Sequence, residues 1–189
     1  MSAASFLRTA RTSRGMSQRA LAQRANVRQP GIADIESGAH DTTLSRLEEL
    51  LAALQYRLTP IPTTSRGVWE VAYAVAAAVL ASDEANAWRQ VIQLADDLAR
   101  EPAATRIALT VTPPPSTGSA RYDALIAGLT EYRLRGLPCP AWVNDSRYSL
   151  ADEWDVETLP SLREAARNAT PEEFSRHGIY LDPRELESV

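Results

Sequence analysis

Apolar residues recur at helical spacing through the first 56 positions of the chain. The repeat is strongest between Leu44 and Leu54, where leucines at positions 44, 47, 50, 51 and 54 fall on one helical face. Shorter repeats of the same period precede it, with polar residues between them. This pattern predicts four short helices, at residues 6–14, 18–25, 28–36 and 43–54.

Residues with known local preferences stand where these predicted helices begin and end. Ser17 can cap the second helix, and Asn26 tolerates the left-handed backbone of a tight turn. Pro30 suits the first turn of the third helix, where no intrahelical donor is needed. Gly38 can end that helix, as Gly15 can end the first. These signals favour two helices joined by a tight turn between Ser17 and Gly38.

The remaining two thirds of the chain is also mainly helical by pattern. Helices are expected at 68–82, 85–100, 121–136 and briefly at 170–174, whereas alternating Ile107, Leu109 and Val111 predict a strand. The apolar faces of the first two suit a core or a pairing surface across a dimer axis. We expect a mainly α fold with few short strands, divided into residues 1–58, a linker at 59–66, and residues 67–189, with a further boundary near 113–120.

Charge is distributed unevenly along the chain, although the net charge is only -4. All 20 basic residues are arginines, and six of them lie in residues 1–28, which contain no acid. Residues 61–189 hold 12 arginines and 19 acids, a balance of -7. Because salt screens distant charges, a local basic region can still contact phosphate on an acidic protein. The alternative is a chance cluster of solvated arginines.

Compartment and membrane signals point to the cytoplasm. Cys139 is the single cysteine, so the chain forms no internal disulfide; it stands between two prolines without a catalytic motif, and we therefore expect a buried structural cysteine rather than a nucleophile. The most apolar window, residues 71–81, is about half the length that a membrane helix needs. We expect no membrane partner.

Motifs for catalysis are missing, and we expect no enzyme, no cofactor and no metal site. His40 and His177 have no partner at metal-ligand spacing, and no glycine-rich phosphate loop is present. Asp152, Glu153 and Asp155 could hold a divalent ion, but a solvated acidic surface is the favoured interpretation.

A family resemblance covers about residues 5–56. The spacing S-Q-x-x-L-A-x-x-A-x-V, then I-x-x-I-E-x-G and T-L-x-x-L, resembles the Cro/Xre-type helix-turn-helix regulators of phages and bacteria. The resemblance implies a lambda-repressor-like DNA-binding domain of four to five helices that binds double-stranded DNA. It also implies a structural ion pair between Arg11 and Glu36.

The same resemblance implies DNA contacts on the second and third helices. Gln18, with Ser17 beside it, would hold a phosphate, and Arg28, Gln29, Pro30 and Asp34 would face the major groove. Arg28 can reach a base or a phosphate, and Asp34 can accept from a cytosine or instead orient Arg24 or Arg28. The full set of expected DNA-binding residues is Ser17, Gln18, Arg19, Arg28, Gln29, Pro30, Gly31, Asp34, Ser37, His40 and Thr43.

The C-terminal sequences GLPCPAWV and ATPEEFSRHGIYLDPRELESV resemble the tails of helix-turn-helix proteins in bacterial toxin-antitoxin pairs whose toxin is a nucleotidyltransferase. This implies a homodimeric repressor on an inverted-repeat operator, acting as the autoregulating antitoxin of a cognate toxin. One alternative is a ligand-sensing regulator that binds a metabolite between Trp88, Trp142 and Trp154. Another is an adaptor that uses its acidic region to hold a partner protein.

Overall fold

The computed structural model describes residues 3–187 and divides the chain into two units, unit 1 (Met1–Pro62) and unit 2 (Thr63–Val189). Both units are mainly helical, and the only strands among the described residues are two of two residues each. The expected mainly α fold with few short strands is therefore confirmed. Within residues 3–187, no helix is long and apolar enough to cross a membrane.

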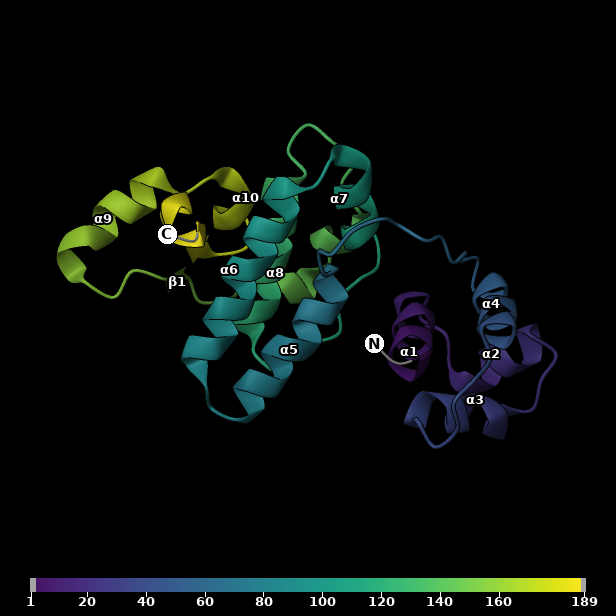
Figure 1. The fold of residues 1–189 in the computed structure, drawn as a ribbon. Helices are drawn as coiled ribbons and strands as arrows, with labels where there is room; N and C mark the ends of the chain where they lie inside the picture. The colour runs from purple at the N-terminus through teal and green to yellow at the C-terminus, as the bar shows by residue number, and fades with distance from the viewer. Residues whose placement is uncertain (1–2, 188–189) are drawn as a thin grey trace. The chain divides into compact units, whose positions relative to one another are not determined.

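Unit 1 is a small bundle of four helices around one core (Figure 1). Each helix contributes fully buried side chains, such as Leu7, Leu21, Ile32 and Leu50. No fifth helix follows, because residues 54–62 continue without helical structure. The helices of unit 1 are α1 (Ala3–Ser13), α2 (Gln18–Arg24), α3 (Gln29–Ser37) and α4 (Leu44–Ala53).

The predicted turn residues of unit 1 have the backbone conformations that the sequence indicated. Asn26 adopts a φ of 53° between α2 and α3, and Gly38 adopts a φ of 75° at the end of α3. Leu44 does not belong to the inner face, since it is 66% exposed. It is the first residue of α4, directly after the capping residue Thr43, and the inner face begins one turn later at Leu47.

Unit 2 is built around one buried helix, α8 (Ala120–Arg133). Residues on every side of α8 are buried, including Ala124 to Thr130 without interruption. A helix that is apolar all round belongs inside a core, and α5, α6 and α10 all pack against α8 (Figure 1). The other helices of unit 2 are α5 (Val68–Leu80), α6 (Glu84–Arg100), α7 (Ala103–Thr110), α9 (Pro160–Ala169) and α10 (Glu172–Ser175), with 3-10 turns η1 (Ala141–Asn144), η2 (Ser146–Tyr148) and η3 (Pro183–Leu186).

The strand predicted at residues 107–111 is wrong, because these residues belong largely to α7. Their burial does not alternate: Ile107 and Leu109 are half-buried, Thr110 is buried and Val111 is 51% exposed. Pro102 starts the helix, and the Thr110 hydroxyl donates to the Arg106 carbonyl one turn back. Packing in a helical unit thus overrides the β propensity of a short apolar run.

The strands that do form are β1 (Trp154–Asp155) and β2 (Ile179–Tyr180), which pair in parallel. The connection between them contains α9, a helix that the sequence pattern did not predict. Only Ala166 of α9 is buried, and Arg167 ties the helix to β1 through Asp155. Polar contacts rather than an apolar stripe hold this helix in place.

Cys139 is exposed, which corrects the prediction of a buried structural cysteine. It lies between α8 and η1, in a segment that begins at Gly136 with a φ of 77°. The prolines on either side favour a surface loop without regular structure, since a proline has no amide hydrogen to donate.

Candidate nucleic-acid interface

Two helix starts define the candidate interface of unit 1. At α2, the Ser17 hydroxyl accepts from the amide of Ala20 at 3.1 Å, as the sequence predicted for a cap. At α3, Arg28 takes the capping position without any side-chain cap, and Pro30 lies in the first turn. The guanidinium of Arg28 is therefore not needed to begin the helix.

A buried ion pair fixes α3 against α1. Arg11 donates to both carboxylate oxygens of Glu36, at 2.7 and 2.8 Å, and the Glu36 side chain is 0% exposed. The hydrogen bond to Glu36 raises the pKa of Arg11 above its ordinary value, so the guanidinium remains charged. The ion pair that the resemblance implied is present, and it is joined by a contact that the sequence did not reveal.

That further contact leads from the buried ion pair to the surface of α3. The amide nitrogen of Gln18 donates to Glu36 at 3.0 Å, and the Gln18 oxygen lies 3.5 Å from the amide nitrogen of Gln29. Gln18 is half-buried, whereas Gln29 is exposed at the first position of α3. The series Arg11, Glu36, Gln18, Gln29 thus places an exposed amide against a rigid support.

Ten of the eleven expected DNA-binding residues are exposed, and Gln18 is the exception. All three exposed hydroxyls of the set are already used within the domain: Ser17 caps α2 by accepting from Ala20, Ser37 donates to the carbonyl of Asp34, and Thr43 caps α4 by accepting from Arg46. Gly31 faces open space, since a Cβ there would meet nothing within 4 Å. The exposed expected residues are Ser17, Arg19, Arg28, Gln29, Pro30, Gly31, Asp34, Ser37, His40 and Thr43.

Three of the six arginines in residues 1–28 bond to other groups of the domain, so they stabilise its fold instead of adding free positive charge to its surface. Arg8 donates to the carbonyl of Glu36, and Arg11 pairs with the Glu36 carboxylate. Arg14 donates to the carbonyl of Leu54 and stacks over Tyr56 at 5.0 Å. The family resemblance assigned a structural role to Arg11 alone, and nothing in the sequence separated Arg8 and Arg14 from the remaining arginines.

The other three arginines, Arg19, Arg24 and Arg28, are exposed, and within residues 3–187 none of them forms an ion pair. The carboxylate of Asp34 is exposed and likewise forms no ion pair with a described residue. The alternative in which Asp34 orients Arg24 or Arg28 is therefore not seen in the free protein. Three cations and one anion remain available on this surface.

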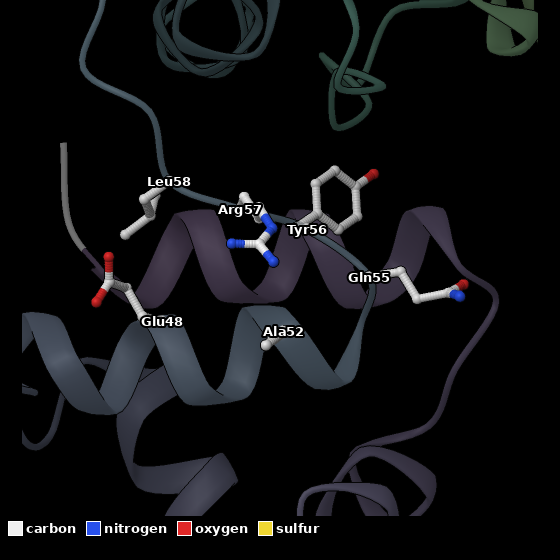
Figure 2. A pocket seen from close by; sticks show the side chains of 6 residues that line it. All are labelled: Glu48, Ala52, Gln55, Tyr56, Arg57 and Leu58. Carbon is white, nitrogen blue, oxygen red and sulfur yellow. The ribbon is translucent and has the colours of Figure 1, made fainter.

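A pocket of about 570 Å³ lies elsewhere in unit 1 (Figure 2). Glu48 and Ala52 come from α4, and the rest of the lining comes from the segment that follows it, with Arg57 beside Tyr56. The Tyr56 hydroxyl bonds to Ser13, so this segment closes over the end of α1. No residue of α2 or α3 lines the pocket, which separates it from the candidate interface.

The acidic residues and tryptophans of unit 2 that the sequence offered as a metal or ligand site make contacts within the unit itself. Arg167 bonds to Glu153 and Asp155 and lowers the pKa of both carboxyl groups. In the part of the chain that the structure describes, no group of three or more His, Cys, Asp or Glu residues is arranged to hold a metal ion. Trp88, Trp142 and Trp154 all pack against the core of unit 2.

The comparisons with known proteins concern unit 1. Residues 7–61 match the family described as Helix-turn-helix, with no part of the match in α5 or beyond. Searches of curated proteins and of solved structures each found no match. The match, the left-handed turn at Asn26 and the exposed α3 agree with one another. Residues 7–61 are therefore a helix-turn-helix domain of the kind that DNA-binding transcription regulators carry.

Proposed function

We propose that the chain is a transcriptional repressor that acts by binding rather than by catalysis, with the first half of α3 in the major groove of double-stranded DNA. The observation that carries the proposal is the support of Gln29. Its amide lies against Gln18, which is held by the buried carboxylate of Glu36. A side chain whose position is restrained before binding loses less entropy when it contacts a base.

The exposed residues of α3 suit base contacts of different kinds. Gln29 can pair with an adenine through two hydrogen bonds, and Pro30 can contact a thymine methyl group. Arg28 is released from capping and can reach a guanine or a phosphate. Asp34, which is free of ion pairs with described residues, can accept from a cytosine amino group.

The unpaired arginines suit phosphate contacts on either side of that groove. Arg24 at the end of α2 and Arg28 directly before α3 flank the tight turn between the helices, and Arg19 lies in the first turn of α2. Each phosphate contact releases condensed counterions, so binding should weaken steeply as salt is raised.

We propose that the chain binds an inverted repeat as a homodimer, and the size of α3 supports this. The helix has nine residues, which is about 14 Å or roughly four base pairs of duplex. Such a helix reads one half-site, and a second copy related by a two-fold axis would read another about 34 Å away.

Selection of DNA from a random pool, followed by titrations at two salt concentrations, tests this function. Gln29→Ala should lose about 1–3 kcal/mol on the selected site and relax the preference at one base pair. Arg19→Ala should weaken all sequences about equally and reduce the salt slope by roughly one. An unchanged affinity and selectivity for Gln29→Ala would show that α3 is not the reading element.

We further propose that unit 2 holds a protein partner, as the antitoxin of a nucleotidyltransferase-type toxin. Its net charge of -7 supports a basic partner, because complementary charge favours both the rate and the choice of association. Expressing the nucleotidyltransferase encoded beside this chain, alone and together with it, tests the idea. Growth arrest that the chain does not relieve, or the lack of such a neighbour, would contradict it.

The alternative of a ligand-sensing regulator has weaker support. Trp142 donates its indole N–H to the Thr110 carbonyl at 2.9 Å and meets Tyr148 edge-on, and Trp154 meets Tyr122 edge-on. These contacts account for both rings without a bound metabolite.

A further inference from the structure

A histidine is buried where three segments of unit 2 meet. His177 is 2% exposed and lies between α10 and β2. Helix α10 packs against α8 (Figure 1), and the His177 ring lies beside Gly128, where a Cβ would be 3.4 Å from its Cδ2. One ring nitrogen contacts Tyr148 of η2 and the other lies near Glu131 of α8. The ring therefore joins α8, η2 and the chain that follows α10.

The contact with Tyr148 fixes the position of one ring hydrogen. Nδ1 of His177 lies 2.8 Å from the carbonyl oxygen of Tyr148. A carbonyl oxygen has no hydrogen to donate, so the hydrogen of this bond belongs to Nδ1. A neutral imidazole has a single ring hydrogen, which would leave Nε2 as an acceptor only.

Nε2 faces a second acceptor. It lies 3.4 Å from the carboxylate Oε2 of Glu131, and both atoms are buried without a hydrogen-bond partner among the described residues. A water molecule cannot lie between them, since two hydrogen bonds in line need about 5.5 Å. Two buried acceptors that face each other have lost their hydration and gained no bond in return. A hydrogen on Nε2 turns the same contact into a donor facing an acceptor.

The charges around the ring favour placing that hydrogen on the histidine. Oε1 of Glu131 accepts from Arg176 at 2.6 Å, and a neighbouring cation stabilises an ionised carboxylate. Arg176 also pairs with Glu172 at 3.2 Å. A charged His177 brings this group to two cations and two carboxylates, so the charges balance.

The other titratable groups beside these residues keep one charge state near neutral pH. Burial, and then the charge of Glu131, raise the pKa of the Cys139 thiol, which stays neutral. Burial raises the pKa of Tyr148 to about 12, so its hydroxyl is neutral as well. The bond from Arg135 lowers the pKa of Glu173, which stays ionised.

We propose that His177 carries a hydrogen on both ring nitrogens in folded unit 2, so that folding takes up a proton and the stability of the unit falls as the pH rises above neutral. In the unfolded chain a histidine releases this proton above about pH 6.5. Stability falls with rising pH wherever the folded state binds more protons than the unfolded state. Phe174 and Ile179, on either side of His177 in the chain, are fully buried in the core, so the proton bears on the whole unit. The inference does not depend on DNA binding.

Long-range ¹H–¹⁵N NMR of the full chain at pH 7.5 tests where the ring hydrogens lie. An ordinary histidine is about 90% neutral at this pH. His40 is the only other histidine, so His40→Gln leaves the signals of His177 alone. We expect the nearly equal nitrogen shifts of a charged ring. A neutral ring with its hydrogen on Nδ1 would overturn the inference.

Two matched variants test whether Glu131 holds the proton in place. Glu131→Gln keeps the shape of the side chain, and its amide can donate to Nε2, so His177 should become neutral in this variant. The control is Glu173→Gln, because Glu173 is 15% exposed at its side chain against 16% for Glu131 and also pairs with an arginine. His177 should stay charged in the control. A charged His177 in Glu131→Gln would contradict the role of Glu131.

Urea titrations from pH 6 to pH 9, followed by tryptophan fluorescence, test the effect on stability. The unfolding equilibrium constant of unit 2 should rise by up to about tenfold for each pH unit above about 7, in the parent and in Glu173→Gln. Glu131→Gln should remove this rise. A parent whose unfolding constant changes with pH no more than that of Glu131→Gln would refute the proposal. If Glu131→Gln does not fold, the parent spectrum at pH 7.5 still supports or overturns it.

Discussion

Replacing Glu36 with alanine removes the one carboxylate that joins α1, α2 and α3. Glu36 accepts from Arg11 twice and from Gln18 once, and its side chain is completely buried. Arg11 is 12% exposed at its side chain, so the variant leaves a nearly buried cation without its partner. Breaking such a pair costs about 3–5 kcal/mol, and we expect the lower end because Arg11 keeps its bond to the Met16 carbonyl.

The distribution of tryptophan allows the effect to be measured in the intact protein. All four tryptophans lie in unit 2, so their fluorescence follows the unfolding of that unit alone. Far-ultraviolet circular dichroism follows the helices of both units. In urea, Glu36→Ala should shift the dichroism transition of unit 1 to lower denaturant and leave the fluorescence midpoint unchanged.

A matched variant on the surface controls for the loss of a charge. Glu49 pairs with Arg46 on α4, and both side chains are well exposed. Exposed pairs contribute about 0–1 kcal/mol, so Glu49→Ala should hardly change the transition of unit 1. If Glu36→Ala destabilised unit 1 by no more than Glu49→Ala does, the Glu36 contacts would not hold the three helices together.

Two further predictions concern unit 2. Burial raises the pKa of Tyr148 from 10.0 to about 12, so the stability that its neutral hydroxyl contributes to unit 2 is fully present below pH 10 and is lost as the pH rises. The free energy of unfolding should fall by up to about 2 kcal/mol between pH 10 and pH 12. Tyr148→Phe should flatten this loss in urea titrations followed by fluorescence. Gly128→Ala should destabilise unit 2 by about 1–2 kcal/mol despite the better helix propensity of alanine, because its Cβ would lie 2.9 Å from the Phe174 ring and 3.1 Å from the Glu173 carbonyl. A higher urea midpoint for Gly128→Ala would show that α8 and α10 are not in close contact.

The helices of unit 1 were predictable because local chemistry and apolar period agree there. Ser17 caps α2, Asn26 takes the left-handed turn, and Gly38 ends α3, each for a reason that can be read from one residue. In unit 2 the secondary structure depends on contacts between residues that are far apart in the sequence. Nothing local distinguishes the helix at Ile107 from a strand, and α9 is held by an arginine that reaches a strand 12 residues away.

The candidate interface was predictable in position but not in its division of roles. The resemblance to helix-turn-helix regulators placed Arg28 and Gln29 at the start of the third helix, where both are exposed. It did not reveal that Arg8 and Arg14 bind backbone carbonyls of the domain, because such a bond depends on where a distant chain segment passes. A count of arginines therefore overstated the cations that remain for DNA.

The contacts of Glu36 also bear on how a partner of unit 2 would control DNA binding. The stability of unit 1 and the base reading that we propose depend on the same group, since the carboxylate that holds α1 to α3 also holds Gln18 beside Gln29. Residues 54–67 between α4 and α5 contain no helix, so the segment that connects the two units is not a continuous helix. A partner can still change how many copies are held together, and tethering a second reading helix raises its effective concentration at the second half-site. Control through unit 2 should therefore change the affinity for paired half-sites while leaving the affinity of one unit for one half-site the same.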